Sequence, residues 1–293
     1  MALSGTYLGS DNQRTYSMTE QGQTPVEIFS KTKGDKYSII GEAIYERPLW
    51  NGKLTTGMKH NQATMDNVYD GDALAKVSMN TAETSFFAEY QSKVGKLNYT
   101  LGMGAMRTFY KQGKARQEKY FFRPTLSMSY SLGKVFLRYN ASLSGYAPSL
   151  SELSDVTQPM DAYQVRRGNP SLKSVTYFSH RLSASYQNKW MNMDVSARYS
   201  YDDKPIMEET VYEDRMFVRT YDNQKEFHRL NTQANLLLQP FGQDVSIKLN
   251  PFFNRFISRG NSYTHTHSNW GFRGSIIGMY KSWTVMMDMF TSN

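Results

Sequence analysis

Few residues in this chain have the type and spacing that catalysis or cofactor binding requires. His265 and His267 lie on one face of a predicted strand, a spacing that lets two imidazoles bind one metal ion. They sit where a loop meets the strand and have no third ligand nearby, so we favour solvated histidines over a metal site. Gly102 and Gly104 form a G-x-G inside a predicted strand, without the third glycine and following helix of a phosphate-binding turn. The sequence therefore predicts no metal site and no cofactor.

A hydrolase site would need a serine, a histidine and a carboxylate that converge at one place. His60, His180 and His228 are scattered over separate predicted strands, and His180 and His228 fall on the apolar face. The chain has no cysteine, which excludes thiol nucleophiles and thiolate metal sites. No serine-hydrolase, nucleotide-loop or zinc-protease motif occurs. We expect no enzyme activity and keep a hydrolase site as the alternative.

Charged residues form the remaining candidates. Glu208, Glu209, Glu213 and Asp214 lie in a predicted loop at 202–225, which contains a short predicted hairpin of Ile206–Tyr212 with Met216–Tyr221. A site for calcium or a cationic ligand is one interpretation, and a solvated loop is the favoured one. A second set lies on the polar sides of strands: Arg123, Arg138, Arg181, Arg198, Arg229 and Arg273, with Glu42, Glu89, Asp194 and Asp244. For most of these we favour mutual charge compensation over contact with a polar solute.

Composition limits the classes of protein that this chain can belong to. Its 293 residues are only 39% hydrophobic, and no apolar run approaches the roughly 18 residues of a membrane helix. The aromatic content of 14% is too high for a disordered chain. The net charge of +8 comes from cations spread singly along the chain, without a basic block. We therefore expect no nucleic-acid partner, and attraction to acidic lipid is the alternative to a surface of mixed charge.

The elements that must carry these residues are strands, because apolar and polar residues alternate along the whole chain. In the segment 190–202, Met193 and Val195 alternate with Asp194 and Ser196, and about a dozen segments of ten or more residues follow the same rule. The mean hydropathy of −0.61 fits walls with one apolar and one polar face. No segment shows a competing helical period.

The connections between these strands alternate strictly between short and long. The long ones are 10–35, 63–81, 111–119, 145–174, 202–225 and 258–266. In an antiparallel sheet, all short turns then fall at one end and all long loops at the other, as in outer-membrane barrels. Aromatic residues suited to a membrane interface lie near the short turns: Tyr45, Trp50, Tyr90, Tyr130, Phe136, Tyr186, Trp190, Tyr280 and Trp283.

The predicted fold is therefore all-β: an antiparallel transmembrane β-barrel with short periplasmic turns and long extracellular loops. We count about 12–13 strands of a larger barrel. An odd count conflicts with the even counts of single-chain bacterial barrels, and residues 1–7 lack an export signal. We therefore expect residues 1–293 to be a partial outer-membrane barrel domain, without a plug domain or signal peptide. A soluble all-β binding protein is a weaker alternative.

Two segments of the longest predicted loop resemble a known family. The first is Tyr146-Ala147-Pro148-Ser149-Leu150-Ser151-Glu152-Leu153, and the second, directly before a strand, is Gly168-Asn169-Pro170-Ser171-Leu172-Lys173. They resemble the Y-x-A-P-S-x-x-E-L and G-N-P-x-L-K-P-E segments in the barrels of TonB-dependent outer-membrane receptors. The chain departs from the second segment at Ser174-Val175, where the family usually has Pro-Glu.

The resemblance implies a barrel of about 22 strands in the outer membrane of a Gram-negative bacterium. Such receptors import siderophores, cobalamin, oligosaccharides or peptides. It implies outer-membrane lipid as a partner, contact with TonB only through a plug that we do not find here, and room for a surface lipoprotein. Ligand contact is expected from the loops 145–174 and 202–225 and from the lumen face. A passive pore is the alternative function within the same membrane.

Overall fold

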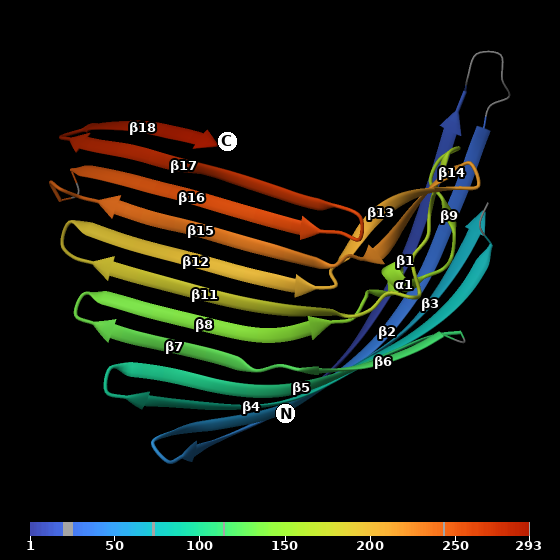
Figure 1. Cartoon of the computed structure of the whole chain (residues 1–293), viewed down its shortest axis with the longest axis horizontal. Helices are drawn as coiled ribbons and strands as arrows, with labels where there is room; N and C mark the ends of the chain where they lie inside the picture. Colours follow the sequence, from blue (N-terminus) through green and yellow to red (C-terminus); the bar gives the residue numbers. More distant parts are fainter. Residues whose placement is uncertain (20–25, 72–73, 114, 243, 293) are drawn as a thin grey trace.

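The wall of the molecule is one curved antiparallel sheet of 14 strands (Figure 1). The computed structural model describes residues 1–19, 26–71, 74–113, 115–242 and 244–292. Neighbouring strands follow chain order: β1 (Ala2–Met18), β2 (Val26–Leu49), β3 (Gly52–Gly71), β4 (Ala75–Val94), β5 (Leu97–Gln112), β7 (Thr125–Leu132), β8 (Val135–Tyr146), β11 (Val175–Gln187), β12 (Met191–Asp203), β15 (Glu226–Leu238), β16 (Val245–Arg259), β17 (Thr264–Tyr280) and β18 (Trp283–Ser292). Among the described residues, no helix has the length and apolar character to cross a membrane.

The remaining strand of the wall, β6 (Ala115–Phe122), is the first half of an interrupted strand that β7 continues. Both pair with β5 in one register, and Arg123 and Gly104 exchange backbone hydrogen bonds of 2.7 and 3.1 Å between them. The interruption falls at Pro124, which has no N–H to donate to a ladder. Counting β6 and β7 as one leaves 13 strands of the 14, so the predicted count is confirmed.

The two faces of the wall separate residues as the alternation predicted. Val195 lies opposite Ala184 and Ala234, whereas Ser196 lies opposite Ser183 and Gln233. We call the face of Val195 the outer face and the face of Ser196 the lumen face. Large apolar side chains of the outer face are exposed in the chain, for example Leu182 at 55%, as expected where lipid rather than protein covers them.

The aromatic side chains near the short turns lie at one end of the sheet, the left end in Figure 1. Trp50 and Tyr90 contact each other there with ring centroids 6.0 Å apart, and Trp283 is 74% exposed. Phe136 differs from the others, because its partners Ser131 and Ser185 place it on the lumen face. The remaining aromatics fit an interfacial girdle.

Four of the six predicted long connections are shorter than the sequence suggested, because the strands continue into them. Strand β1 extends to Met18 and β2 begins at Val26, while β3 extends to Gly71 and β4 begins at Ala75. Thus 10–35 and 63–81 are mostly strand, apart from 20–25 and 72–73, which lie outside the described residues; 111–119 and 258–266 shrink likewise. Beyond the membrane both faces of a hairpin are wet, so the alternation that marks a strand fades.

The assignment of faces predicts opposite outcomes at two adjacent positions. Val195→Lys places a charge near the middle of the lipid-facing surface and should destabilise the barrel by about 2–4 kcal/mol. Ser196→Lys places the same charge in the wet lumen and should cost far less. Urea titration of both variants in lipid vesicles measures the difference. Equal destabilisation by the two would contradict the assignment.

Candidate functional site

The two longest loops come together above the wall in a second, four-stranded sheet. It consists of β9 (Gln158–Pro159) and β10 (Gln164–Arg166) from one loop, and β13 (Ile206–Glu213) and β14 (Met216–Asn223) from the other. The hairpin predicted at Ile206–Tyr212 with Met216–Tyr221 is confirmed. Strand β10 pairs in parallel with β14, so the two loops suspected of ligand contact form one cap at the long-loop end (Figure 1).

The two family-like segments hold the first loop in shape through backbone hydrogen bonds. In the short helix α1 (Leu150–Leu153), the N–H of Ser149 donates to the Glu152 carboxylate at 2.6 Å, which caps the turn. The N–H of Asn169 donates to the carbonyl of Glu152 at 2.6 Å, and that of Gly168 to Ser154 at 2.7 Å. The segments are therefore two halves of one loop structure.

The second segment also ties this loop to the β13–β14 hairpin and to the wall. Asn169 donates its side-chain amide to the carbonyl of Tyr221 at 3.0 Å. The N–H of Lys173 donates to the Asn223 side chain at 2.6 Å. Gln117 of β6 donates to the carbonyl of Pro170 at 2.8 Å. The cap and the wall are joined through this segment.

Apolar side chains of the motif anchor the loop against the lumen face. Leu153 and Leu172 are 1% and 2% exposed. They pack with Tyr69, Met79 and Tyr110, which come from β3, β4 and β5. Full burial of a leucine contributes about 1.5–3 kcal/mol, so this loop is held inward over the lumen. Of the remaining motif residues, Pro148 is buried, and Ala147 and Tyr146 reach a cavity below the loop.

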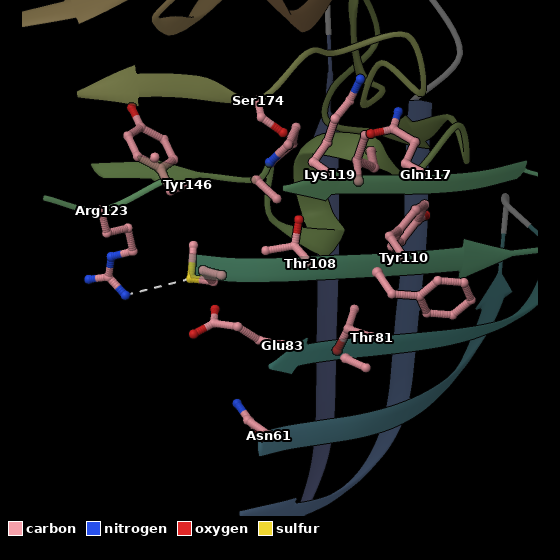
Figure 2. Close-up of a pocket in the computed structure, with 17 residues that line it drawn as sticks. Asn61, Thr81, Glu83, Thr108, Tyr110, Gln117, Lys119, Arg123, Tyr146 and Ser174 are labelled. Atoms are coloured by element: carbon pink, nitrogen blue, oxygen red, sulfur yellow. Dashed lines mark hydrogen bonds between the residues drawn. The ribbon is translucent and has the colours of Figure 1, made fainter. Parts of the chain in front are cut away.

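That cavity, of about 390 Å³, lies between the inward-folded loop and the lumen faces of β3 to β6 (Figure 2). Its size falls in the range of small-molecule sites. The loop contributes Tyr146, Ala147, Pro148, Leu153 and Ser174. The wall contributes Asn61, Thr81, Ala82, Glu83, Met106, Thr108, Phe109, Tyr110, Gln117, Lys119, Arg123 and Gly145. Aromatic, charged and hydroxyl groups thus face one space.

The charges in the cavity have no partners of their own. Among the described residues, neither Glu83, Lys119 nor Arg123 forms an ion pair. Glu83 and Lys119 lie on either side of Thr108, as its partners on the two neighbouring strands. Their backbones are therefore two strand spacings apart, about 10 Å. Within the described ranges, the guanidinium group of Arg123 donates to the sulfur of Met106, at 3.7 Å, and to no other side chain. A molecule with groups of both signs would be complementary to this arrangement.

Two polar atoms that line the cavity walls are also unsatisfied. Oδ1 of Asn61 and Oγ of Ser174 are buried without a hydrogen-bond partner among the described residues. Buried polar atoms normally have a partner in the protein or in water. Together with the charges of Glu83, Lys119 and Arg123, these atoms make the cavity the candidate binding site of the described chain.

The other candidates from the sequence do not assemble into sites. In the described part of the chain, no group of three or more His, Asp or Glu residues could hold a metal ion. His265 and His267 are exposed on β17. In the acidic loop, Glu208 accepts Nε of Arg219 at 2.8 Å, and Glu213 pairs with Arg167 at 3.0 Å. These ion pairs neutralise part of the acidic group.

The three strand histidines all lie on the outer face, where each contacts a hydroxyl group. His60 lies 2.8 Å from Thr84 Oγ1, His180 lies 2.5 Å from the Tyr139 hydroxyl, and His228 lies 2.8 Å from the Tyr199 hydroxyl. In each case the Nδ1 atom is paired with a hydroxyl group on a neighbouring strand. The histidines are held apart and do not converge with a serine and a carboxylate.

The expectation that the lumen-facing arginines form ion pairs with the four predicted acids is wrong. All six lie on the lumen face by register. Within the described ranges, only Arg229 forms an ion pair, with Asp202 at 2.9 Å, and Asp202 is not one of the four predicted acids. The physical reason is spacing, because the acids lie on rows or strands too far from the arginines for contact.

The fold and the site together define an outer-membrane β-barrel with a capped, polar lumen. A model of the "Outer membrane protein beta-barrel family" matches residues 2–292, and the chain belongs to that family. The protein is located in the outer membrane of a Gram-negative bacterium, as predicted. No curated protein sequence matches the chain.

Solved receptor structures share this fold. The copper transporter OprC has a TM-score of 0.70 at 10% identity, over 94% of this chain and 48% of that one. A double mutant of the hemophore receptor HasR of Serratia marcescens, solved with HasA and heme, has a TM-score of 0.61 at 11% identity, over 99% of this chain and 57% of that one. A ferric enterobactin receptor mutant of Pseudomonas aeruginosa has a TM-score of 0.58 at 11% identity, over 94% of this chain and 53% of that one. The chain spans about half the length of these structures, and the resemblance to TonB-dependent receptor barrels is confirmed for the fold.

Sequence reasoning identified the loop but missed most of the cavity. Among the wall residues, only Arg123 was singled out, whereas Glu83 and Lys119 were not. These two lie 36 positions apart in sequence, and only the register through Thr108 brings them near each other. The short turn at 93–96 would have placed Glu83 opposite Thr108, but Lys119 joins them through the pairing of β5 with β6, which lies across the connection predicted as 111–119.

The packing of the loop predicts a large effect from one methyl group at Gly168. A Cβ there would lie 2.5 Å from the Ser154 carbonyl oxygen and 2.6 Å from that of Glu152. Gly168→Ala should therefore weaken the loop by about 1–3 kcal/mol and speed amide exchange at Asn169. Gly278→Ala is the control, because a Cβ at Gly278 meets nothing within 4 Å. Unchanged exchange at Asn169 would contradict this account of the motif.

The cap should also respond to pH through Glu209. Burial, with a smaller contribution from the charge of Asp222, raises the pKa of Glu209. The Glu209 carboxyl group therefore binds a proton more tightly in the folded cap than in the unfolded chain. As the pH falls from the raised pKa to the ordinary value, the folded cap becomes more stable. Glu209→Gln removes the buried charge, so it should stabilise the cap at about pH 7 and abolish the further stabilisation at lower pH. Limited proteolysis of the cap across pH measures this; an unchanged pH profile in the variant would refute it.

Proposed function

We propose that the chain forms part of the barrel wall of a TonB-dependent outer-membrane receptor. This receptor takes up a nutrient such as a siderophore, oligosaccharide, cobalamin or peptide. The observation that carries the proposal is the cavity below the inward-folded loop. It lies on the lumen side at the long-loop end, where a solute from outside would first meet the barrel.

In this proposal the ligand contacts the loop 145–174 directly, and the loop 202–225 supports the site without lining the cavity. Residues 145–174 supply Tyr146 and Ser174 to the cavity, while 202–225 holds that loop in place through Asn223 and Tyr221. Glu83 and Arg123 supply opposite charges from the wall. The copper, enterobactin and hemophore proteins named above differ in what they carry, so the shared fold does not select a ligand.

The partners follow from the same proposal. Outer-membrane lipid covers the outer face. Contact with TonB would be made by the plug that the family resemblance implies, rather than by the wall. A surface lipoprotein would have the cap of β9, β10, β13 and β14 to bind, where Tyr212 and Phe217 are 66% and 47% exposed. A hydrolase site is disfavoured because His60, His180 and His228 lie apart on the outer face, and a passive pore is the alternative that the experiment must separate.

The test uses the complete receptor in the outer membrane of its host. A panel of ferric siderophores, cobalamin, maltooligosaccharides and short peptides is screened for saturable binding to outer-membrane vesicles and for uptake by cells. We expect one class to bind and its uptake to stop when TonB is deleted. Arg123→Gln should weaken binding about tenfold, the effect of losing one charge-assisted hydrogen bond.

Lys134→Gln, in a short turn far from the cavity, is the matched control and should bind normally. Uptake that continues without TonB would establish a passive pore. Saturable binding that is unaffected by Arg123→Gln and by Tyr146→Ala would place the ligand elsewhere and overturn the assignment of the cavity.

A further inference from the structure

Two arginines face each other directly on the lumen wall, well away from the cavity below the loop. Arg181 lies half-way along β11 and Arg198 half-way along β12, and the two are register partners. Both are exposed on the lumen face. Asn140 lies opposite Arg181 on the other side, and Asn231 lies opposite Arg198. The four side chains form a row across β8, β11, β12 and β15.

Like charges directly opposite each other on antiparallel strands are destabilising. Nothing in the described chain offsets this pair. Arg198 donates to Ser179 Oγ at 3.3 Å and to the Tyr177 hydroxyl, both neutral groups. Arg181 forms no ion pair among the described residues. The pair therefore retains a full double positive charge.

The acids on the same face are too far away to neutralise the pair. Asp194 is four residues from Arg198 along β12, about 13 Å, and it accepts a hydrogen bond from Ser185. Glu89 lines one of the hollows that the pair borders, but its strand β4 lies four strand spacings from β11, about 19 Å along the sheet, and among the described residues it forms no ion pair with either arginine. Asp202 is already paired with Arg229 at 2.9 Å. No acid of the described wall thus occupies the position between the two guanidinium groups.

The surroundings of the pair are open and rich in hydrogen-bonding groups. Arg181 and Arg198 border two hollows of the lumen wall, of about 560 and 550 Å³. Besides the two arginines, the polar side chains that line these hollows are Glu89, Thr100, Thr125, Ser127, Asn140, Ser142, Ser179, Ser196, Asn231, Thr232, Gln233, Asn235, Asn250, Asn254 and Arg273. Asn140 and Asn231 flank the pair directly, so a group seated between the two arginines would have a neutral hydrogen-bonding partner on each side.

We propose that Arg181 and Arg198 together bind one carboxylate or phosphate group at mid-height of the lumen. Two guanidinium forks can each donate to a planar or tetrahedral oxyanion, which turns their mutual repulsion into attraction for the guest. The anionic group belongs either to a solute in transit or to an acidic side chain of a protein segment that fills the lumen. The site extends the proposed function, and it requires only the barrel wall, not the cavity below the loop.

The experiment measures how fast individual arginines react with phenylglyoxal in the complete receptor, in outer-membrane vesicles, with mass spectrometry of each site. Citrate is the probe anion. Arg138 is the matched control, because it is also on the lumen face but lies opposite Ser129 and Ser183 rather than another cation.

If the site accepts a free anion, saturating citrate slows modification of Arg181 and Arg198 about tenfold, as expected for a charge-assisted hydrogen bond, and leaves Arg138 unchanged. If a protein carboxylate occupies the site, Arg181 and Arg198 react about tenfold more slowly than Arg138 before citrate is added. Equal rates at all three sites, with no selective protection, would overturn the proposal.

A second variant separates a bound anion from simple steric shielding. Arg181→Gln removes one charge of the pair. It should lower the midpoint of thermal unfolding where an anion bridges the two arginines, and the loss should exceed that of Arg138→Gln. A higher midpoint in Arg181→Gln would mean that the pair is only repulsive, and it would overturn the proposal even if phenylglyoxal reacts slowly. Neither result depends on the ligand of the cavity, so both remain informative if the proposed receptor function fails.

Discussion

Hydrocarbon offers the backbone no hydrogen-bond partner, and the rest of the structure depends on this constraint. Every N–H and C=O that crosses the membrane must be paired within the protein, so a continuous antiparallel ladder is required. The ladder in turn fixes which residues share a row. When Pro124 removes one donor, Arg123 and Gly104 continue the register at 2.7 and 3.1 Å. Functional groups on the lumen face are therefore placed by the pairing rather than by local sequence.

This dependence explains which parts of the fold the sequence predicts well. Inside the membrane one face contacts lipid and the other contacts water. Val195 is therefore apolar and Ser196 polar, and this difference predicts the face of each residue. Outside the membrane that contrast disappears, and the strand extensions to Met18 and Gly71 went unrecognised. The hairpin of Ile206–Tyr212 with Met216–Tyr221 was predicted within its loop, because β-forming residues on both sides of a short turn mark it.

The candidate site was predictable only in part, for a related reason. The two loop segments are each continuous in sequence, so their residues could be recognised together. Glu83 and Lys119 come near each other because both pair with Thr108 on the strand between them. The alternation in the sequence predicts which face a residue lies on, but not which residues of neighbouring strands lie directly opposite it. The same limit explains the wrong expectation for the arginines, because charges on one face were taken as partners without knowledge of their rows.

The loop and the wall divide the requirements of a binding site between them. Leu153 and Leu172 supply apolar burial, and the backbone bonds of Gly168 and Asn169 fix the loop, so stability does not draw on the cavity's charges. Within the part of the chain that the structure describes, those charges form no ion pairs, and neither do Arg181 and Arg198 farther down the wall. A lumen that needed them for stability would have paired them, as it paired Arg229 with Asp202. Retained charge on a wall that is held by its backbone ladder is therefore best understood as capacity for a polar guest.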